Sequence, residues 1–474
     1  MNNYKLFIDG NWINSNGSLE VLDKYSQEVY AQVAKANEET VDQAISGAWH
    51  AFERDKLSPF ERYQILHKAS QLIIEQKDEL ANIITKEAGK PLKQARTEID
   101  RSAQTFLVAA EEAKRIHGEG VPVEAAPGSE NRMAFTIKVP VGVVGAISPF
   151  NFPLNLVAHK IAPALAAGNA VVLKPASKTP ISSLKLAEIL DKAGLPKGLL
   201  QVVVGSGSTV GNQMMKDERI AVYTFTGSAE VGLKLKQETG LKRLILELGN
   251  NSPVIVDKEA NVNLAAKTLA AQSFAFAGQV CISVQRIYVH ESIKDTFMEK
   301  LTKQISALKI GDPSDPETDV GPMISEEEAK RAEKWIQEAV SDGATIAHGG
   351  KRKGALLEPT IITDVTKEMR VVCEEIFAPV ASVISYNDLD ECIKEINQSD
   401  YGLQGGIFTQ NIDTAYYAAK RVEVGGFMIN DGSQYRVDLM PYGGVKDSGS
   451  GKEGPKYSIE EMTEERLIVM NLKE

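Results

Sequence analysis

The fold is indicated by a series of short β-branched runs that begins with Val139-Pro140-Val141-Gly142-Val143-Val144-Gly145-Ala146-Ile147 and Ala170-Val171-Val172-Leu173. The series continues at residues 200–204, 222–225, 244–246 and 254–256. Most of the intervening pieces are amphipathic and long enough for the crossover helix that parallel neighbours need. The pattern therefore predicts an α/β fold with a doubly wound, Rossmann-like parallel sheet.

A second α/β region follows residue 257. Its helical periodicity covers residues 259–277, 291–307 and 325–342, and strand-like runs occur at 285–290, 359–363, 379–385 and 404–408. We expect a separate domain whose first helix ends at Cys281.

The N-terminal part contains a hairpin signal and a helix signal. Residues 1–33 alternate apolar and polar side chains around Asp9-Gly10, which predicts a hairpin. Ser58-Pro59-Phe60-Glu61 is a capping box with proline at the first helical position, and it begins one of two or three helices before residue 117.

Residues 118–137 and the C-terminal segment 464–472 stand apart from both patterns. The C-terminal segment is apolar with charges at both ends, which is typical of a terminal strand. Such a strand needs another edge to cover it, and a partner subunit could supply that edge.

Composition limits the function. The 474 residues are 43% hydrophobic and 25% charged, with a formal net charge of −11, which argues against a broad nucleic-acid or membrane surface. The N-terminus has no apolar signal segment, and no apolar run is long enough to span a membrane. Three cysteines are too few for a disulfide framework, so we expect a cytoplasmic protein in which Cys373 and Cys392 are inert.

Cys281 and Glu247 are the candidate nucleophile and base. Cys281 lies among small side chains in Ala277-Gly278-Gln279-Val280-Cys281-Ile282-Ser283, and a cysteine nucleophile needs such access. Glu247 ends an apolar strand run, where a desolvated carboxylate of raised pKa can serve as a general base. The alternatives are an inert buried cysteine and a structural ion pair of Glu247 with a residue such as Arg243.

A rigid turn supplies a candidate oxyanion donor. The run Ser148-Pro149-Phe150-Asn151-Phe152-Pro153-Leu154-Asn155 places two asparagines among prolines before a predicted helix. Such a turn can aim the Asn151 amide at one point, as an oxyanion hole requires. Helix capping is the alternative, and we expect it for Asn155.

Two more stretches lie where a nucleotide would bind in an open α/β sheet. Lys174-Pro175-Ala176-Ser177 follows the run 170–173, so Lys174 is either a ribose or phosphate ligand or an ordinary surface lysine. Gly205-Ser206-Gly207-Ser208-Thr209-Val210-Gly211 is rich in glycine, but its spacing differs from the dinucleotide fingerprint.

These stretches occur in the same order in the aldehyde dehydrogenase superfamily, which the chain resembles over essentially its whole length. The matching motifs are Pro149-Phe150-Asn151-Phe152-Pro153, Lys174-Pro175-Ala176, Phe225-Thr226-Gly227-Ser228, Glu247-Leu248-Gly249, Gly278-Gln279-Val280-Cys281, Glu374-Glu375-Ile376-Phe377-Ala378-Pro379 and Pro441-Tyr442-Gly443-Gly444-Val445-Lys446-Asp447-Ser448-Gly449.

The resemblance implies a mechanism. Cys281 would attack the aldehyde carbon, and the Asn151 amide and the backbone N–H of Cys281 would hold the oxyanion. Hydride would pass to the nicotinamide of NAD or NADP. A water activated by Glu247 would then hydrolyse the thioester to a carboxylate.

The resemblance also implies cofactor ligands and no metal site. Lys174 and Glu375 would hold ribose hydroxyls, Phe377 would pack beside the nicotinamide ribose, and Ser228 with its helix N-terminus would meet the pyrophosphate. We expect the same site to include Ser148, Phe150, Ser177, Gly205, Gly211 and Gly227.

The family's architecture implies three domains. Residues 1–117 and 138–248 would form the cofactor-binding domain, and residues 249–450 the catalytic domain. Residues 118–137 and 451–474 would form a small β domain that bridges the subunits of a homodimer or homotetramer.

Two positions depart from the family's usual pattern. Gly249-Asn250 stands where two glycines are usual, so the turn there is expected to differ. Ser177 stands where many NAD-specific members have glutamate, whose charge would repel the 2′-phosphate of NADP, and this favours NADP or dual use.

The substrate region resembles one subgroup of the family. Gln279-Val280-Cys281-Ile282-Ser283-Val284-Gln285-Arg286 and Tyr435-Arg436-Val437-Asp438-Leu439-Met440-Pro441-Tyr442 are similar to segments of lactaldehyde, sulfolactaldehyde, non-phosphorylating glyceraldehyde-3-phosphate and some succinate-semialdehyde dehydrogenases. Many of these substrates are short anions, for which arginine is an apt receptor. Arg101 and Arg436 are the candidates, with structural ion pairs as the alternative.

Two other functions stay open. One is a CoA-acylating semialdehyde dehydrogenase, although relatives of that kind typically lack the glutamate that corresponds to Glu247. The other is a structural or binding protein that keeps the fold without turnover.

Overall fold

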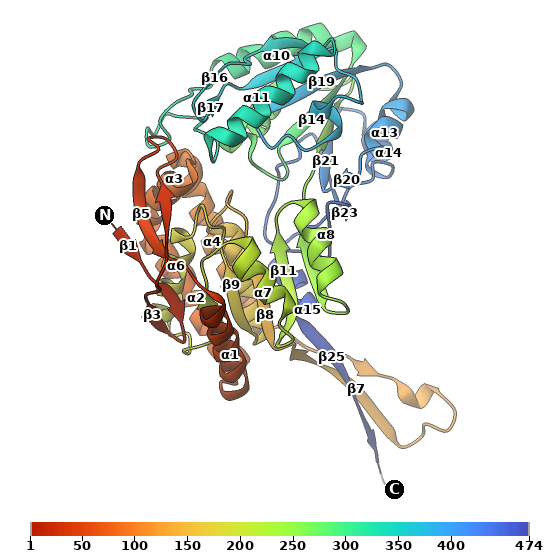
Figure 1. The fold of residues 1–474 in the computed structure, drawn as a ribbon. Helices are drawn as coiled ribbons and strands as arrows, with labels where there is room; N and C mark the ends of the chain where they lie inside the picture. The colour runs from red at the N-terminus through yellow and green to blue at the C-terminus, as the bar shows by residue number, and fades with distance from the viewer. Residues whose placement is uncertain (1, 473–474) are drawn as a thin grey trace.

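The computed structural model describes residues 2–472, which form two lobes and a projecting arm (Figure 1). One lobe is built on an eight-stranded sheet and the other on a seven-stranded sheet, while a three-stranded sheet forms the arm. Helices pack against both large sheets, which confirms the predicted α/β class.

The eight-stranded sheet has the order β24-β12-β11-β8-β9-β10-β2-β3. Its strands are β2 (Leu6–Ile8), β3 (Asn11–Ile13), β8 (Val143–Ile147), β9 (Ala170–Lys174), β10 (Leu200–Val202), β11 (Ile220–Thr226), β12 (Arg243–Glu247) and β24 (Gly449–Ser450). Strands β8 to β12 are mutually parallel, as the β-branched runs predict. The expected hairpin joins β2 to β3 through Asp9 and Gly10, whose φ angles are 52° and 67°.

Helices and a small sheet complete this lobe. The capping box at Ser58 and Glu61 is present at the start of the second helix, as predicted. The helices are α1 (Glu38–Arg54), α2 (Pro59–Glu75), α3 (Lys77–Ala88), α4 (Leu92–Ala113), α5 (Asn155–Ala167), α6 (Ile181–Ala193), α7 (Asn212–Lys216), α8 (Ala229–Glu238) and α15 (Pro455–Glu461), and the small sheet contains β1 (Asn2–Tyr4), β4 (Ser18–Leu22) and β5 (Val29–Ala34).

The seven-stranded sheet has the order β15-β18-β19-β14-β13-β21-β22. Its strands are β13 (Ser252–Val256), β14 (Val284–His290), β15 (Thr345–His348), β18 (Thr360–Thr363), β19 (Val380–Tyr386), β21 (Gln404–Phe408) and β22 (Gly426–Ile429). The run 254–256, expected in the first series of strands, is therefore part of the second sheet. The short connection from β12 to β13 carries the chain between lobes, because it is too short for a crossover helix.

Helices of the second lobe are α9 (Val262–Phe274), α10 (Lys294–Ser306), α11 (Glu326–Ser341), α12 (Arg370–Cys373), α13 (Leu389–Asn397) and α14 (Ile412–Ala419). Two small two-stranded sheets pair β16 (Arg352–Lys353) with β17 (Leu356–Leu357) and β20 (Tyr401–Gly402) with β23 (Val445–Lys446).

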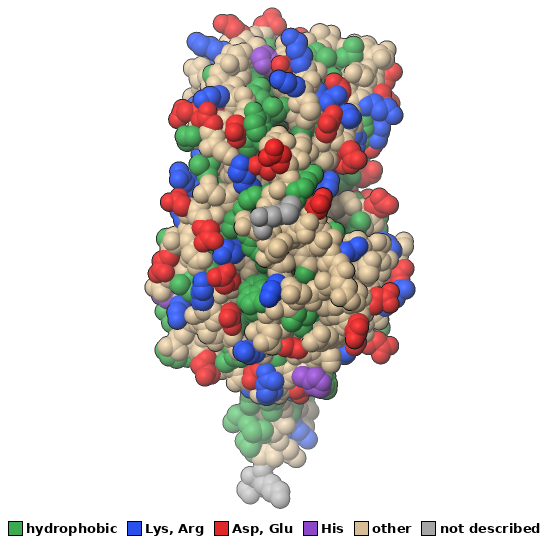
Figure 2. All heavy atoms as spheres, turned by 60° about the vertical axis from the view of Figure 1, so that its left-hand side comes forward, with side chains coloured by type: hydrophobic (Ala, Val, Ile, Leu, Met, Phe, Trp, Pro, Cys, Tyr) green, Lys and Arg blue, Asp and Glu red, His purple; other side chains and the backbone are tan. Residues whose placement is uncertain are grey.

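The arm consists of β6 (Gly120–Val121), β7 (Arg132–Pro140) and β25 (Thr463–Asn471). The predicted C-terminal strand is confirmed as β25, and the edge that covers it is β7 of the same chain. The other edge of β25 has no neighbour in this three-stranded sheet. Hydrophobic side chains are visible on the arm in Figure 2, and Leu467 and Val469 are 55% and 49% exposed.

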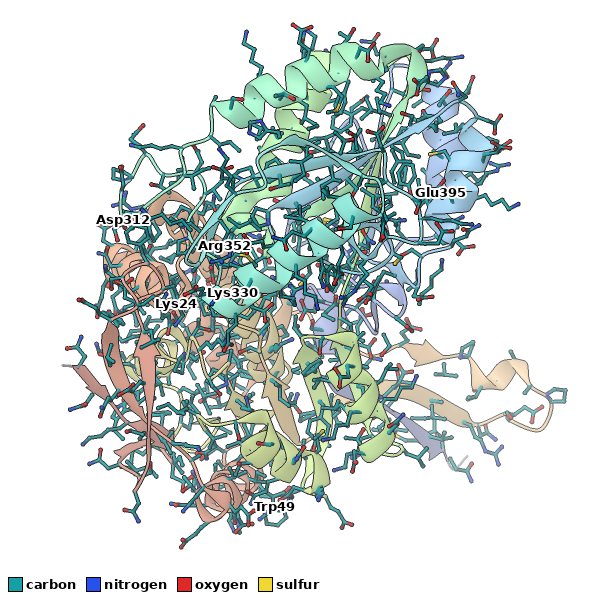
Figure 3. The ribbon with its side chains drawn as sticks, turned by 45° about the horizontal axis from the view of Figure 1, so that its top comes forward. Lys24, Trp49, Asp312, Lys330, Arg352 and Glu395 are labelled. Carbon is teal, nitrogen blue, oxygen red and sulfur yellow. The ribbon has the colours of Figure 1, made fainter. Side chains whose placement is uncertain are left out.

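The two lobes also meet where α4 begins. The backbone N–H of Leu92 donates to the carbonyl of Pro313 at 2.8 Å, and Lys93 forms an ion pair with Asp319. Lys24 and Asp312, labelled in Figure 3, lie near the two sides of this junction. Within residues 2–472, no helix has both the length and the apolar composition needed to cross a membrane.

Candidate active site

The carboxyl ends of the parallel strands present several candidate residues along one edge. Ile147 is the register partner of Lys174, and Thr226 is that of Glu247. Ser148 and Gly227 directly follow β8 and β11 at the same edge. The structure thus brings Ser148, Lys174, Gly227 and Glu247 to the carboxyl side of one sheet, where open α/β proteins bind ligands.

Cys281 lies beyond an unusual loop and not at the end of a helix, so the expected end of the first helix at Cys281 is wrong. Helix α9 ends at Phe274, and Phe276, Ala277 and Gly278 then adopt φ angles of 47°, 51° and 68°. A Cβ on Gly278 would lie 2.0 Å from the carbonyl oxygen of Ala378, so glycine is required there.

Asn151 and Cys281 are neighbours. The Nδ2 atom of Asn151 lies 4.0 Å from the Cys281 Sγ and donates a 2.9 Å hydrogen bond to the carbonyl of Gln279. Burial, and next the Glu375 carboxylate, raise the pKa of Cys281 to about 12, while the Asn151 contact opposes this shift. The arrangement has the form of a nucleophile with an amide donor beside it.

Glu247 is buried, and within residues 2–472 neither of its carboxylate oxygens has a hydrogen-bond partner. A Cβ on Gly443 would lie 3.1 Å from its Oε1. Burial, and next the nearby Glu453 carboxylate, raise its pKa well above the usual value. The alternative of an ion pair with Arg243 is wrong, because Arg243 binds Glu464 at 2.9 Å. An unpartnered carboxyl of raised pKa is suited to general-base chemistry.

A buried ion-pair cluster behind Glu247 consists of Lys160, Arg436 and Glu453. Glu453 binds Lys160 at 3.1 Å and Arg436 at 3.0 Å. Burial alone would raise its pKa, but Lys160 and Arg436 lower it to about 2. Sequence reasoning did not identify Lys160 or Glu453, although a lysine inside the apolar helix α5 signals a buried carboxylate partner.

A cavity of about 70 Å³ opens at Cys281. It is lined by Arg101, Phe152, Asn155, Leu156, Val280, Cys281, Ile282, Gln434, Arg436 and Tyr442. Both candidate arginines line the cavity, but they differ in their ion-pair partners. The guanidinium of Arg436 binds Glu453 and lies 3.6 Å from the ring centroid of Tyr442.

Arg101 has no such support. Among the hydrogen bonds and ion pairs of residues 2–472, none involves its guanidinium. Burial, and next the positive charge of Arg436, lower the pKa of Arg101. The Asp438 and Glu98 carboxylates oppose this shift, but neither forms an ion pair with the guanidinium within residues 2–472. A partly buried cation without an ion-pair partner favours an anionic ligand.

A second cavity of about 300 Å³ is lined by Phe150, Ala176, Ser177, Lys178, Gln279, Ile324, Glu328, Arg331 and Phe377. The rings of Phe150 and Phe377 meet edge to face at 6.0 Å. Gln279 lines this groove, and the next two residues of the chain, Val280 and Cys281, line the cavity at Cys281.

Other cofactor candidates gather near the groove. Ser177 donates to the carbonyl of Gly205 at 2.7 Å, and a Cβ on Gly211 would lie 4.0 Å from Cδ of Lys174. Burial lowers the pKa of Lys174 to about 8, and its ammonium donates to the carbonyl of Pro175 at 3.3 Å. Ser228 caps α8 through the N–H of Val231.

Glu375 contacts Asn250, which stands where the family usually has a second glycine. Glu375 accepts a 3.0 Å hydrogen bond from the Asn250 N–H, and burial raises the pKa of Glu375 to about 8. The Asn250 side chain contacts Ser252 and Leu403. Neither Gly249 nor Asn250 has a positive φ, which explains why the second glycine is not needed.

The expected capping by Asn155 is wrong, because its amide donates to Thr105 at 3.1 Å. Glu98 accepts from the N–H groups of Leu154 and Asn155 instead, at 2.9 and 3.1 Å. A carboxylate from another helix thus satisfies the start of α5.

A cysteine with an amide donor and a buried carboxyl close by is the set of groups that enzymes working through a covalent cysteine adduct require. The model of the aldehyde dehydrogenase family matches residues 12–468. The chain belongs to the aldehyde dehydrogenase family, and it is an oxidoreductase that acts on aldehydes.

Named relatives and solved structures agree with this assignment. The 3-sulfolactaldehyde dehydrogenase of Priestia aryabhattai is 53% identical over 99% of this chain and 98% of the relative. The structure of aldehyde dehydrogenase 21 from Physcomitrella patens with the reaction product succinate is 42% identical, with a TM-score of 0.96 over 99% and 98% of the two chains. An NADP complex of the NADP-dependent glyceraldehyde-3-phosphate dehydrogenase from Bacillus halodurans is 37% identical, with a TM-score of 0.97 over the whole of both chains.

Proposed function

We propose that this enzyme oxidises a short aldehyde with an anionic group to its carboxylate, using NAD or NADP. The observation that carries the proposal is the unpartnered guanidinium of Arg101 in the cavity that contains Cys281. The names of three similar proteins refer to compounds with a sulfonate, a carboxylate and a phosphate. Their shared feature is a compact anion, which an arginine binds well.

The groove beside Gln279 fits a dinucleotide. Among the described residues, buried Lys174 has no carboxylate partner and the buried Ser148 hydroxyl has no hydrogen-bond partner. Lys174 and Glu375 would hold ribose hydroxyls, and Phe150, Ser177 and Phe377 would line the groove. Bound NAD or NADP would supply the hydride acceptor.

The chain's own residues account for the remaining chemistry. The Cys281 thiol gives up its proton to water, its Sγ attacks the aldehyde carbon, and the Asn151 amide with the Cys281 N–H stabilises the oxyanion of the thiohemiacetal. Loss of hydride leaves a thioester on Cys281. Glu247 takes a proton from water, which attacks the thioester and releases the carboxylate and the thiol.

Water is the favoured acyl acceptor over CoA. Glu247 has a raised pKa and no hydrogen-bond partner in the part of the chain that the structure describes, as a base that activates water requires. In a CoA-acylating enzyme this carboxyl would have no role in the second half-reaction. Product analysis with and without CoA tests the point, because a thioester product formed only with CoA would contradict hydrolysis.

The substrate class is tested with 3-sulfolactaldehyde, succinate semialdehyde and glyceraldehyde 3-phosphate, each assayed separately with NAD and NADP. Lactaldehyde and propanal serve as short neutral controls. We expect kcat/KM for at least one anion to exceed that of both controls by about tenfold or more, the value of one charge-assisted hydrogen bond. A neutral aldehyde oxidised as well as every anion would contradict the proposal.

The three-domain division and a homo-oligomer are part of the same proposal. Strand β25 presents exposed Leu467 and Val469 on an arm that projects from the two lobes. A second copy would bury these side chains. Light scattering should show a dimer or tetramer, and Leu467→Glu should shift the population toward monomer.

A further inference from the structure

The loop before Cys281 holds a backbone conformation that needs external support. Phe276 and Ala277 have φ angles of 47° and 51°, and Gly278 has 68°. The left-handed region is unfavourable for residues with a Cβ, so consecutive residues remain there only where their surroundings hold them.

Gln94 of helix α4 supplies part of that support. Its Oε1 accepts a 2.9 Å hydrogen bond from the N–H of Phe276, and its Nε2 donates at 2.9 Å to the carbonyl of Asp319. Asp319 belongs to the loop after α10, in which Asp312 is labelled in Figure 3. One amide therefore joins the nucleophile loop to the loop at the junction of the lobes.

The hydrogen bonds continue from Phe276 to the oxyanion donor. The carbonyl of Phe276 accepts from the backbone N–H of Gln279 at 3.1 Å and from its Nε2 at 3.2 Å. The carbonyl of Gln279 accepts at 2.9 Å from Nδ2 of Asn151, which lies 4.0 Å from Cys281 Sγ. Displacement of Phe276 would therefore change where the Asn151 amide points.

The same face of α4 also holds the Asn151 turn. Glu98 follows Gln94 by four positions and accepts from the N–H groups of Leu154 and Asn155. Lys90 binds Glu98 and places its ammonium 3.6 Å from the ring centroid of Phe152. Both sides of the oxyanion site thus rest on one rigid helix.

We propose that Gln94 is a positioning residue that fixes the Asn151 amide relative to the Cys281 sulfur. The inference rests on the roles proposed above for Asn151 and Cys281. Gln94 does not touch the reacting atoms, and it acts through the hydrogen bonds of Phe276 and Gln279.

Gln94→Met removes both hydrogen bonds and keeps the length of the side chain. We expect kcat to fall by about ten- to a hundredfold, as for a small misplacement of a catalytic group, with KM changed by less than about threefold. Gln104→Met, at an exposed position of the same helix, is the matched control and should keep wild-type kcat. Thermal unfolding shows whether each variant is folded.

Alkylation of Cys281 by iodoacetamide separates positioning of the amide from general disorder of the loop. That reaction forms no oxyanion, so we expect its rate in Gln94→Met to stay within about twofold of wild type. An alkylation rate that falls in parallel with kcat would overturn the proposal.

A double-mutant cycle with Asn151→Ala completes the test. If Gln94 acts through Asn151, Gln94→Met should lower kcat by less than about twofold in the Asn151→Ala background. An undiminished loss in that background, or kcat in Gln94→Met equal to that of the control, would overturn the inference. Wild-type activity of Asn151→Ala alone would instead contradict the oxyanion role in the proposed function.

Discussion

The cavity at Cys281 and the ion-pair cluster behind it use charged side chains in opposite ways. In the cavity, the Arg101 guanidinium has no partner among residues 2–472, and nearby Glu247 has no hydrogen bond. In the cluster, Glu453 binds both Lys160 and Arg436. Unpaired buried charge is costly, so its retention indicates a ligand or reaction, whereas paired charge indicates a scaffold.

Arg436 shows that the sequence alone does not reveal whether a buried arginine has an ion-pair partner. It lines the same cavity as Arg101, yet its guanidinium is already ion-paired with Glu453. The two arginines, equivalent as sequence candidates, therefore differ in the part each can have in binding. We propose that Arg101 recognises the substrate and that Arg436 supports the cavity wall.

The largest effect is expected for Glu247→Gln, which tests the unpaired group. Loss of a general base should lower kcat by about 100- to 10,000-fold. Because acylation precedes the step that Glu247 serves, rapid mixing should show a burst of reduced cofactor followed by slow turnover. Thermal unfolding should be unchanged, since no hydrogen bond is lost.

The pH profile gives the control for that variant. The pKa of Glu247 is raised well above its usual value, chiefly by burial, so its basic form appears only as the pH rises through the raised value. The wild-type kcat should therefore increase with pH above the ordinary carboxyl range, and this rise should be absent in Glu247→Gln. A wild-type kcat that is flat from about pH 5 upward would contradict the assignment.

Glu453→Gln tests the paired group and should act mainly on stability. It leaves Lys160 and Arg436 buried without their counter-charge, which should cost about 3–5 kcal/mol in the free energy of unfolding. Urea denaturation measures the loss, and Glu460→Gln at an exposed position of α15 is the matched control. An unchanged unfolding midpoint would show that the cluster is not a scaffold.

The free energy of unfolding that Glu453→Gln loses should also depend on pH. Lys160 and Arg436 lower the pKa of Glu453 from 4.5 to about 2 against the opposing effect of burial. Its stabilisation is therefore complete above the unfolded pKa and is lost as the pH falls from about 4.5 toward about 2. The difference in stability between wild type and Glu453→Gln should shrink over that range.

Arg101→Met is expected to have the next largest effect and should separate the two arginines. Loss of charge-assisted hydrogen bonds should lower kcat/KM for an anionic aldehyde by about ten- to a hundredfold, and leave a short neutral aldehyde nearly unaffected. Arg436→Met should lower stability and reduce activity toward both kinds of aldehyde. Arg96→Met, on the exposed side of the same helix, is the control.

Equal losses for the anionic and the neutral aldehyde in Arg101→Met would contradict anion recognition. A loss confined to the anion in Arg436→Met, with stability unchanged, would reverse the assignment of the two arginines.

The sequence predicts features that depend on short motifs better than features that depend on contacts between distant residues. Cys281, Glu247 and Asn151 each lie in a short motif, and the β-branched runs identified the parallel strands. Gln94 and Glu98 could not be found in this way, since they contact Phe276 and Leu154 from 182 and 56 positions away. The run 254–256 was misplaced because a β-branched run indicates a strand but not its sheet.

The smallest effect is expected at Ser177, which lies in the cofactor groove and forms no ion pair. Ser177→Glu would add a carboxylate beside the carbonyl of Gly205 that the serine now contacts. We expect KM for NADP to rise by about tenfold through repulsion of the 2′-phosphate, while KM for NAD stays unchanged or falls. Ser177→Gln, similar in size but neutral, separates charge from bulk. If the glutamine variant weakens NADP as strongly as the glutamate variant, the effect is steric, and the choice of cofactor depends on another part of the groove.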